Sequence, residues 1–129
     1  MEAAMKLSRQ YFLEKKPAEP RRTNFIARKE SYHGTTLGAL SVSGHVSRRA
    51  LFEPMLMKNI SRVSACNAYR GMHEGESEPQ YVARLADELD AEFQRIGPET
   101  VIAFVAEPVV GAVSEARPPT WLSKIVHLT

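Results

Sequence analysis

Val-Ile-Ala-Phe-Val-Ala at residues 101–106, followed by Glu107 and Pro108, is the stretch that decides the fold class. It is short, apolar and rich in β-branched residues, which is typical of a strand buried on both faces of a parallel sheet. A helix is predicted just before it, and a helix, a short turn and a buried strand in this order indicate an α/β fold. Ligands bind beyond the carboxyl ends of strands in such sheets, so Glu107 is a candidate site residue.

The helix predicted over residues 79–97 carries one apolar stripe. Its apolar side chains follow one another by three or four positions, as one face of a helix requires; they are Val82, Leu85, Leu89, Phe93 and Ile96. Gly97 and Pro98 then end the helix, because glycine can adopt the left-handed cap conformation and proline cannot continue a helix.

The first part of the chain predicts a second helix and a second strand. Residues 2–14 have helical periodicity and high helix propensity, and the prolines at positions 17 and 20 end that helix. Residues 24–28 read as a short strand, followed by a loop over 31–34 and a small helical segment over 35–42. Between residues 45 and 78 the periodicity fades, so we expect mostly loop with a short element or two.

Composition excludes several classes of protein. The 129 residues are 43% hydrophobic and 25% charged, which is typical of a globular domain. The 17 basic and 15 acidic residues are scattered, and no concentrated basic patch predicts nucleic-acid binding. No apolar run reaches the roughly 18–20 residues that span a bilayer, and no signal peptide is evident. We expect an intracellular protein that binds no membrane, in the cytoplasm rather than in a mitochondrion.

Two interpretations of the loop Tyr32–His33–Gly34 are open from its residues alone. An aromatic ring, an imidazole and a glycine beyond a strand suit the wall of a cofactor pocket, but they also suit an ordinary turn. Glu107 is equally open, since it could anchor a pocket or mark the point where a strand reaches water. The four histidines and Cys66 match no zinc-ligand spacing, so no metal site is predicted.

Several segments, taken together and in order, resemble the class III pyridoxal-phosphate aminotransferases. Residues 2–12 resemble the helix that follows the family's phosphate-binding turn. Residues 32–44, which begin Tyr-His-Gly-Thr-Thr, resemble its cofactor-stacking loop and the next helix. Residues 101–111 resemble its buried strand and Glu-Pro signature, and short matches fall at residues 52–54 and 69–70.

The resemblance implies fold type I: an α/β large domain with a mostly parallel sheet flanked by helices, working as a homodimer. It implies that residues 1–119 are an incomplete part of this pyridoxal-phosphate-binding domain, and that residues 120–129 are a divergent tail. The implied reaction transfers an amino group from an amine or amino acid to a 2-oxo acid. Tyr32 would stack on the pyridoxal ring, His33 would line the pocket, Gly34 would allow close backbone approach and Glu107 would organise the wall behind the cofactor.

Other parts of the family's machinery find no match in this sequence. They are the phosphate-binding turn, the aspartate at the pyridine nitrogen and the Schiff-base lysine, so no catalytic residue is assigned and we expect the chain to be inactive alone. An alternative is a non-catalytic paralogue that binds a full-length aminotransferase through the dimer surface. Ala112 replaces a glutamate found in some relatives that use dicarboxylates, which disfavours ornithine and 4-aminobutyrate as substrates. The departure after Pro119 suggests an error in the gene model.

Overall fold

The computed structural model describes residues 1–108. The predicted boundary at residue 119, the tail over 120–129 and Ala112 lie outside the described residues. The elements, with η for short 3-10 helices, are α1 (Glu2–Glu14), β1 (Asn24–Arg28), α2 (Leu37–Val42), α3 (Val46–Arg49), η1 (Glu53–Met55), β2 (Ile60–Val63), α4 (Ala68–Gly71), α5 (Glu78–Ile96), η2 (Pro98–Thr100) and β3 (Val101–Val105).

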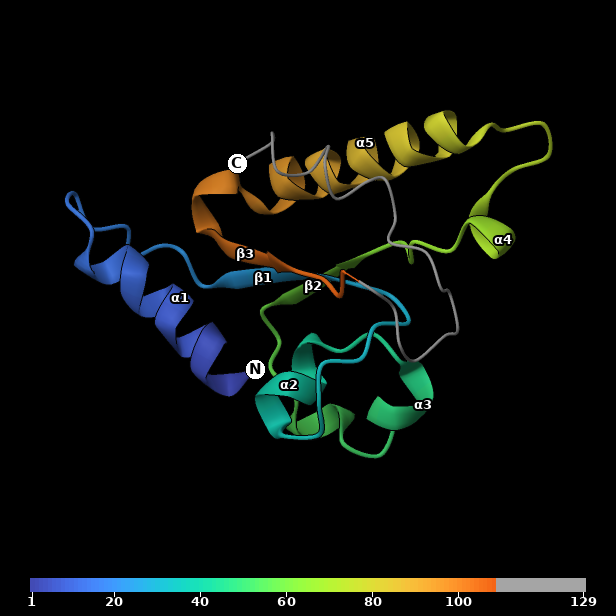
Figure 1. The fold of residues 1–129 in the computed structure, drawn as a ribbon. Coiled ribbons are helices and arrows are strands. Elements are labelled where there is room, and N and C mark those ends of the chain that lie inside the picture. Colours follow the sequence, from blue (N-terminus) through green and yellow to red (C-terminus); the bar gives the residue numbers. More distant parts are fainter. Residues whose placement is uncertain (109–129) are drawn as a thin grey trace.

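The three strands form a parallel sheet in the order β2-β1-β3. Helix α5 lies over one face of this sheet, and α1 and α2 lie on the opposite side (Figure 1). Parallel neighbours need long crossover connections, and here the segment from α2 to η1 makes the first crossover and α5 makes the second. The prediction of an α/β fold with a parallel sheet is therefore confirmed.

Side chains that alternate along β1 fill two separate cores. Phe25 packs with Met5 of α1 and Val42 of α2, whereas Ile26 points to the other face and packs against Leu89 of α5. The strand β1 is buried on both faces because it is the central strand: Phe25, Ile26 and Ala27 are at most 4% exposed.

The predictions for the other two strands need correction. Strand β3 is not buried throughout: Val101 and Ile102 are buried, but residues 103–105 are half-buried because β3 is an edge of the described sheet. Strand β2 was not predicted, since Ile-Ser-Arg-Val at residues 60–63 is short, half-buried and polar at its centre. An edge strand with this composition gives no periodic apolar signal.

Helix α5 also fastens the loop that follows β2. Its residue Tyr81 is 2% exposed, and its hydroxyl donates to the main-chain oxygen of Ala65 at 3.1 Å and accepts from the amide of Asn67 at 3.0 Å. Tyr81 lies just outside the predicted apolar stripe, so the stripe alone did not identify it as a core residue. The helix ends at Gly97, which has a φ of +90°.

Gly44 brings the end of the α2 segment against the end of β1. Its amide donates to the main-chain oxygen of Ser31 at 2.9 Å. A Cβ atom at Gly44 would lie 2.1 Å from the main-chain oxygen of Arg28 and 2.7 Å from the amide nitrogen of Glu30. Only glycine fits this contact, because both neighbours are backbone atoms that cannot rotate away.

We therefore expect Gly44→Ala to destabilise the fold. Forcing backbone apart costs about 3 kcal/mol, and urea denaturation of the 129-residue chain, followed by far-UV circular dichroism, measures the loss. The matched control is Gly75→Ala, where no atom lies within 4 Å of the added Cβ and only the φ of +77° is strained. The control should lose about 1 kcal/mol. Equal losses in the two variants would show that the contact at Gly44 is unimportant.

Candidate cofactor site

A hydrogen bond between two strand ends organises the candidate site. The Glu107 carboxylate, two residues beyond β3, accepts from the amide N–H of Tyr32 at 2.7 Å. The main-chain oxygen of Glu107 accepts from the guanidinium of Arg28, the last residue of β1, at 2.8 Å. Glu107 is thus held through its main chain and holds the Tyr32 loop through its side chain.

The Tyr32 ring is half-buried and has a cation on one face. The guanidinium carbon of Arg48, on α3, lies 4.7 Å from the ring centroid, which is a cation–π distance. This contact restrains the ring, so it presents a fixed aromatic surface. Nothing in the sequence pattern singled out Arg48, because the contact depends on how α3 folds back onto the loop.

His33 follows Tyr32 in this loop, and its imidazole is half-buried. Its amide donates to the Ser43 hydroxyl at 2.9 Å, and that hydroxyl donates to the main-chain oxygen of Ala39. Burial lowers the pKa of His33 below its ordinary 6.5; the Glu107 carboxylate opposes this shift and the Arg28 charge adds to it. The ring atom Nε2 is buried without a hydrogen-bond partner in the described part of the chain. An unsatisfied buried group of this kind costs about 1–3 kcal/mol, which a polar ligand atom would relieve.

Gly34 follows with a backbone conformation that side chains rarely adopt. Its φ is +130°, and an added Cβ would lie 3.1 Å from the Cβ of Ala39. The loop therefore comes close to α2 at this point and carries no side chain of its own there.

Glu2 joins the start of α1 to the start of α2. Its carboxylate accepts from the Thr36 hydroxyl at 2.5 Å and from the Ala39 amide at 3.0 Å. The bond from Thr36, followed by that from Ala39, lowers the pKa of Glu2. The amino end of α1 therefore lies beside α2 and the loop that precedes it (Figure 1). Sequence reasoning placed Glu2 in a helix but gave it no role.

Arg62 on β2 holds the other end of α2. Its guanidinium donates to the main-chain oxygen of Ser43 at 3.0 Å and also to that of Ser41. These carbonyls end a helix and have no partner within it, so a cation there satisfies them and complements the helix dipole. Both ends of α2, and with them the Tyr32 loop, are fixed by side chains from elsewhere in the chain.

The short matches to the family lie outside this cluster. Phe52 is 44% exposed and Tyr69 is 92% exposed, and within residues 1–108 neither is a hydrogen-bond or ring partner of Tyr32 or Glu107. Within residues 1–108 there is no group of three or more His, Cys, Asp or Glu residues that could hold a metal ion. Among the described helices, none is long and apolar enough to cross a membrane.

Comparison with known proteins identifies the family. The sequence profile of the family described as Aminotransferase class-III matches residues 1–129. An aminotransferase of Gibberella zeae is 64% identical over 126 residues, which are 96% of this chain and 25% of that protein. A probable gamma-aminobutyrate transaminase 4 of Oryza sativa subsp. japonica is 40% identical over 108 residues, which are 82% of this chain and 22% of that protein.

A solved structure agrees with the sequence comparisons. The omega transaminase of Pseudomonas jessenii in complex with PMP superposes with a TM-score of 0.87 at 30% identity, over 98% of this chain and 28% of that one. This chain thus spans about a quarter of the length of the relatives it matches. The family profile matches the whole sequence, and the parallel sheet is consistent with that match. The chain belongs to the class III aminotransferases.

Proposed function

We propose that this chain forms the cofactor-stacking part of an enzyme that uses pyridoxal phosphate to transfer an amino group from an amine or amino acid to a 2-oxo acid. The observation that carries the proposal is the Glu107–Tyr32 hydrogen bond, which gathers Tyr32, His33 and Gly34 at the carboxyl ends of β1 and β3. Ligands of open α/β sheets bind at such a position.

The residues of this loop suit a flat, electron-poor ring. Tyr32 offers an aromatic face backed by the Arg48 guanidinium, and Gly34 leaves room for close approach. The orphaned Nε2 of His33 would gain a partner from a polar atom of the cofactor. When bound, pyridoxal phosphate withdraws electrons from the substrate carbon that bears the amino group, which makes a proton there removable.

The chain's own residues would orient the ring and exclude water from one of its faces. Tyr32 would stack on the ring. The Glu107 carboxylate would hold Tyr32 beside the end of β3, because it accepts a hydrogen bond from the Tyr32 amide. His33, neutral because burial lowers its pKa, would add a polar contact without adding a charge. Glu2 would keep the amino end of α1 close to the same loop, on the side where the family's phosphate-binding turn is expected.

The 129 residues would not complete the reaction by themselves. The resemblance matches none of them to the covalent lysine or to the aspartate at the pyridine nitrogen, and the class III enzymes supply both. We therefore propose that catalysis, the homodimer and the choice of amino donor and 2-oxo acid belong to a longer chain that contains this segment. The cytoplasm remains the predicted compartment.

A chimera tests the proposed function. This chain would replace the matching segment of the Gibberella zeae aminotransferase, with which it shares 64% identity. We expect the chimera to bind pyridoxal phosphate and to transfer amino groups, and we expect the 129-residue chain alone to show no activity. A chimera that folds as the parent does but neither binds the cofactor nor turns over would contradict the proposal.

In that chimera, Tyr32→Ala should weaken cofactor binding. An aromatic stack contributes about 0.5–1.5 kcal/mol, so the dissociation constant of pyridoxal phosphate should rise about two- to tenfold. Titration of the cofactor-free protein, followed by cofactor absorbance, measures the constant. Tyr11→Ala is the matched control, since Tyr11 is 59% exposed on α1 and lies outside the site. An unchanged constant for Tyr32→Ala would remove Tyr32 from the site.

His33 should make the stability of the 129-residue chain depend on pH. Its pKa in the folded chain lies below the ordinary 6.5, so the unfolded chain takes up the proton first as the pH falls. The free energy of unfolding should therefore decrease as the pH falls through the ordinary pKa of the unfolded histidine, from about pH 7 downward. Urea denaturation at several pH values should show a flatter dependence for His33→Asn and no flattening for His73→Asn, which changes an exposed histidine. Identical profiles for His33→Asn and the unmodified chain would show that His33 is not buried as described.

A further inference from the structure

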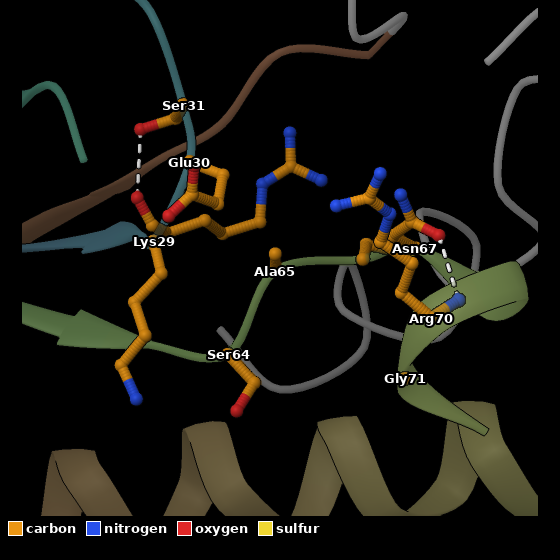
Figure 2. Close-up of a pocket in the computed structure, with 10 residues that line it drawn as sticks. Lys29, Glu30, Ser31, Ser64, Ala65, Asn67, Arg70 and Gly71 are labelled. Atoms are coloured by element: carbon orange, nitrogen blue, oxygen red, sulfur yellow. Dashed lines mark hydrogen bonds between the residues drawn. The ribbon is translucent and has the colours of Figure 1, made fainter. Parts of the chain in front are cut away.

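A cavity lies at the carboxyl edge of the sheet, between the loops that follow β1 and β2. It has a volume of about 330 Å³ and is bounded on one side by α4 (Figure 2). Ten residues of the described part of the chain line it: Arg28, Lys29, Glu30, Ser31, Ser64, Ala65, Cys66, Asn67, Arg70 and Gly71. None of Tyr32, His33, Gly34 and Glu107 is among them, so this cavity is separate from the proposed cofactor contacts.

The lining is cationic. Arg28 and Arg70 contribute positive charges, whereas the Lys29 side chain extends away from Arg70 (Figure 2), and Glu30 is the one acidic residue among the described lining residues. Arg28 is only 4% exposed, and its guanidinium donates to the main-chain oxygen of Glu107. Burial lowers the pKa of Arg28 more than the nearby Cys66 and Glu107 raise it. An anion in the cavity would add to the stabilisation that Glu107 and Cys66 already give this desolvated charge.

Arg70 reaches the cavity from the opposite wall. Its side chain extends from α4 toward the loop after β1 (Figure 2). Its amide donates to the side-chain oxygen of Asn67 at 3.0 Å, whereas its guanidinium makes no hydrogen bond or ion pair within residues 1–108. The cavity thus has the exposed guanidinium of Arg70 on one wall and the buried guanidinium of Arg28 on the other.

The walls are built on anchored backbone. The Ser64 amide and hydroxyl both donate to the Glu88 carboxylate at 3.0 Å, and the Tyr81 hydroxyl holds Ala65 and Asn67. On the β1 side the Ser31 hydroxyl donates to the main-chain oxygen of Arg28 at 2.7 Å. The backbone of the Ser64–Asn67 wall and of the Ser31 wall is therefore anchored before any ligand arrives, while the Arg70 side chain would be ordered on binding.

We propose that this cavity binds a small organic or inorganic anion through a carboxylate or phosphate group held between Arg28 and Arg70. Planar guanidinium groups donate paired hydrogen bonds that match the oxygens of both groups. The volume lies at the small end of the range of ligand sites, and the carboxyl ends of parallel strands are where such sites occur. The proposal does not depend on pyridoxal phosphate binding at Tyr32.

Cys66 supplies the readout, since it is the one cysteine of the chain and lines the cavity. The 129-residue chain would be alkylated with N-ethylmaleimide, and the tryptic peptide of residues 63–70 quantified by mass spectrometry. Phosphate and succinate are the probes, each compared with chloride at the same ionic strength. For a dissociation constant on the order of 1 mM, about 10 mM probe should slow alkylation about tenfold.

The variants assign any protection to the cavity. Arg70→Gln should abolish the protection of Cys66. This variant lacks the tryptic site at residue 70, so Cys66 is quantified in the peptide of residues 63–84. Far-UV circular dichroism checks that the variant is folded. Arg21→Gln should leave the protection intact, because Arg21 is 71% exposed, pairs with Glu99 and does not line the cavity. Protection by phosphate alone or by succinate alone supports the proposal and identifies which group binds.

Three results would overturn the proposal. The first is that neither phosphate nor succinate protects Cys66 better than chloride does. The second is equal protection in the unmodified chain and in Arg70→Gln. The third is alkylation of the chain in buffer as fast as in concentrated urea, which would show that the chain does not form the cavity. None of these outcomes bears on the chimera test of the proposed function, so the two proposals can fail separately.

Discussion

The hydrogen bond from the Tyr32 amide to the Glu107 carboxylate links the end of the central strand to the end of its neighbour. Such a bond is strong because the acceptor is charged, and it satisfies a loop N–H that has no other partner within residues 1–108. Glu107 is placed for it by Arg28, which binds its main-chain oxygen. The loop then continues to His33, whose amide donates a hydrogen bond to the Ser43 hydroxyl at the end of α2.

The parallel sheet makes this arrangement possible. Because β1, β2 and β3 all run in the same direction, the loops that follow them meet at one edge, and residues 75 positions apart in the sequence become hydrogen-bonded neighbours there. The crossovers also determine which face each helix covers. Helix α5 buries the Ile26 face of β1, while α1 and α2 bury the Phe25 face and leave the carboxyl edge to loops.

Helices and strands could be predicted from the sequence where neighbouring residues alone determine them. Helices α1 and α5 and strands β1 and β3 were predicted to within one or two residues, because apolar spacing, prolines and the Gly97–Pro98 stop act over short distances. Strand β2 was missed because its central residues are polar. Glu2, Arg48 and Arg62 were missed as supports of the site for a different reason: each acts on a residue at least 16 positions away, and no single-sequence pattern records such pairs. Tyr32, His33 and Glu107 were candidates because they follow predicted strands, and the resemblance gave them roles; the structure brings Tyr32 and Glu107 into contact through a hydrogen bond.

Arg28 divides the carboxyl edge into two regions with different electrostatics. On the β1–β3 side its guanidinium binds the main chain of Glu107 and its charge helps to keep His33 neutral, which suits a site that accepts a flat ring. On the β1–β2 side the same guanidinium contributes to a cavity whose described lining also includes Arg70 and one acidic residue, Glu30. One buried charge therefore serves both regions, and replacing it with an apolar residue would disturb both. Arg70 contributes to the cavity alone, which is why that residue can separate the cavity from the neighbouring loop.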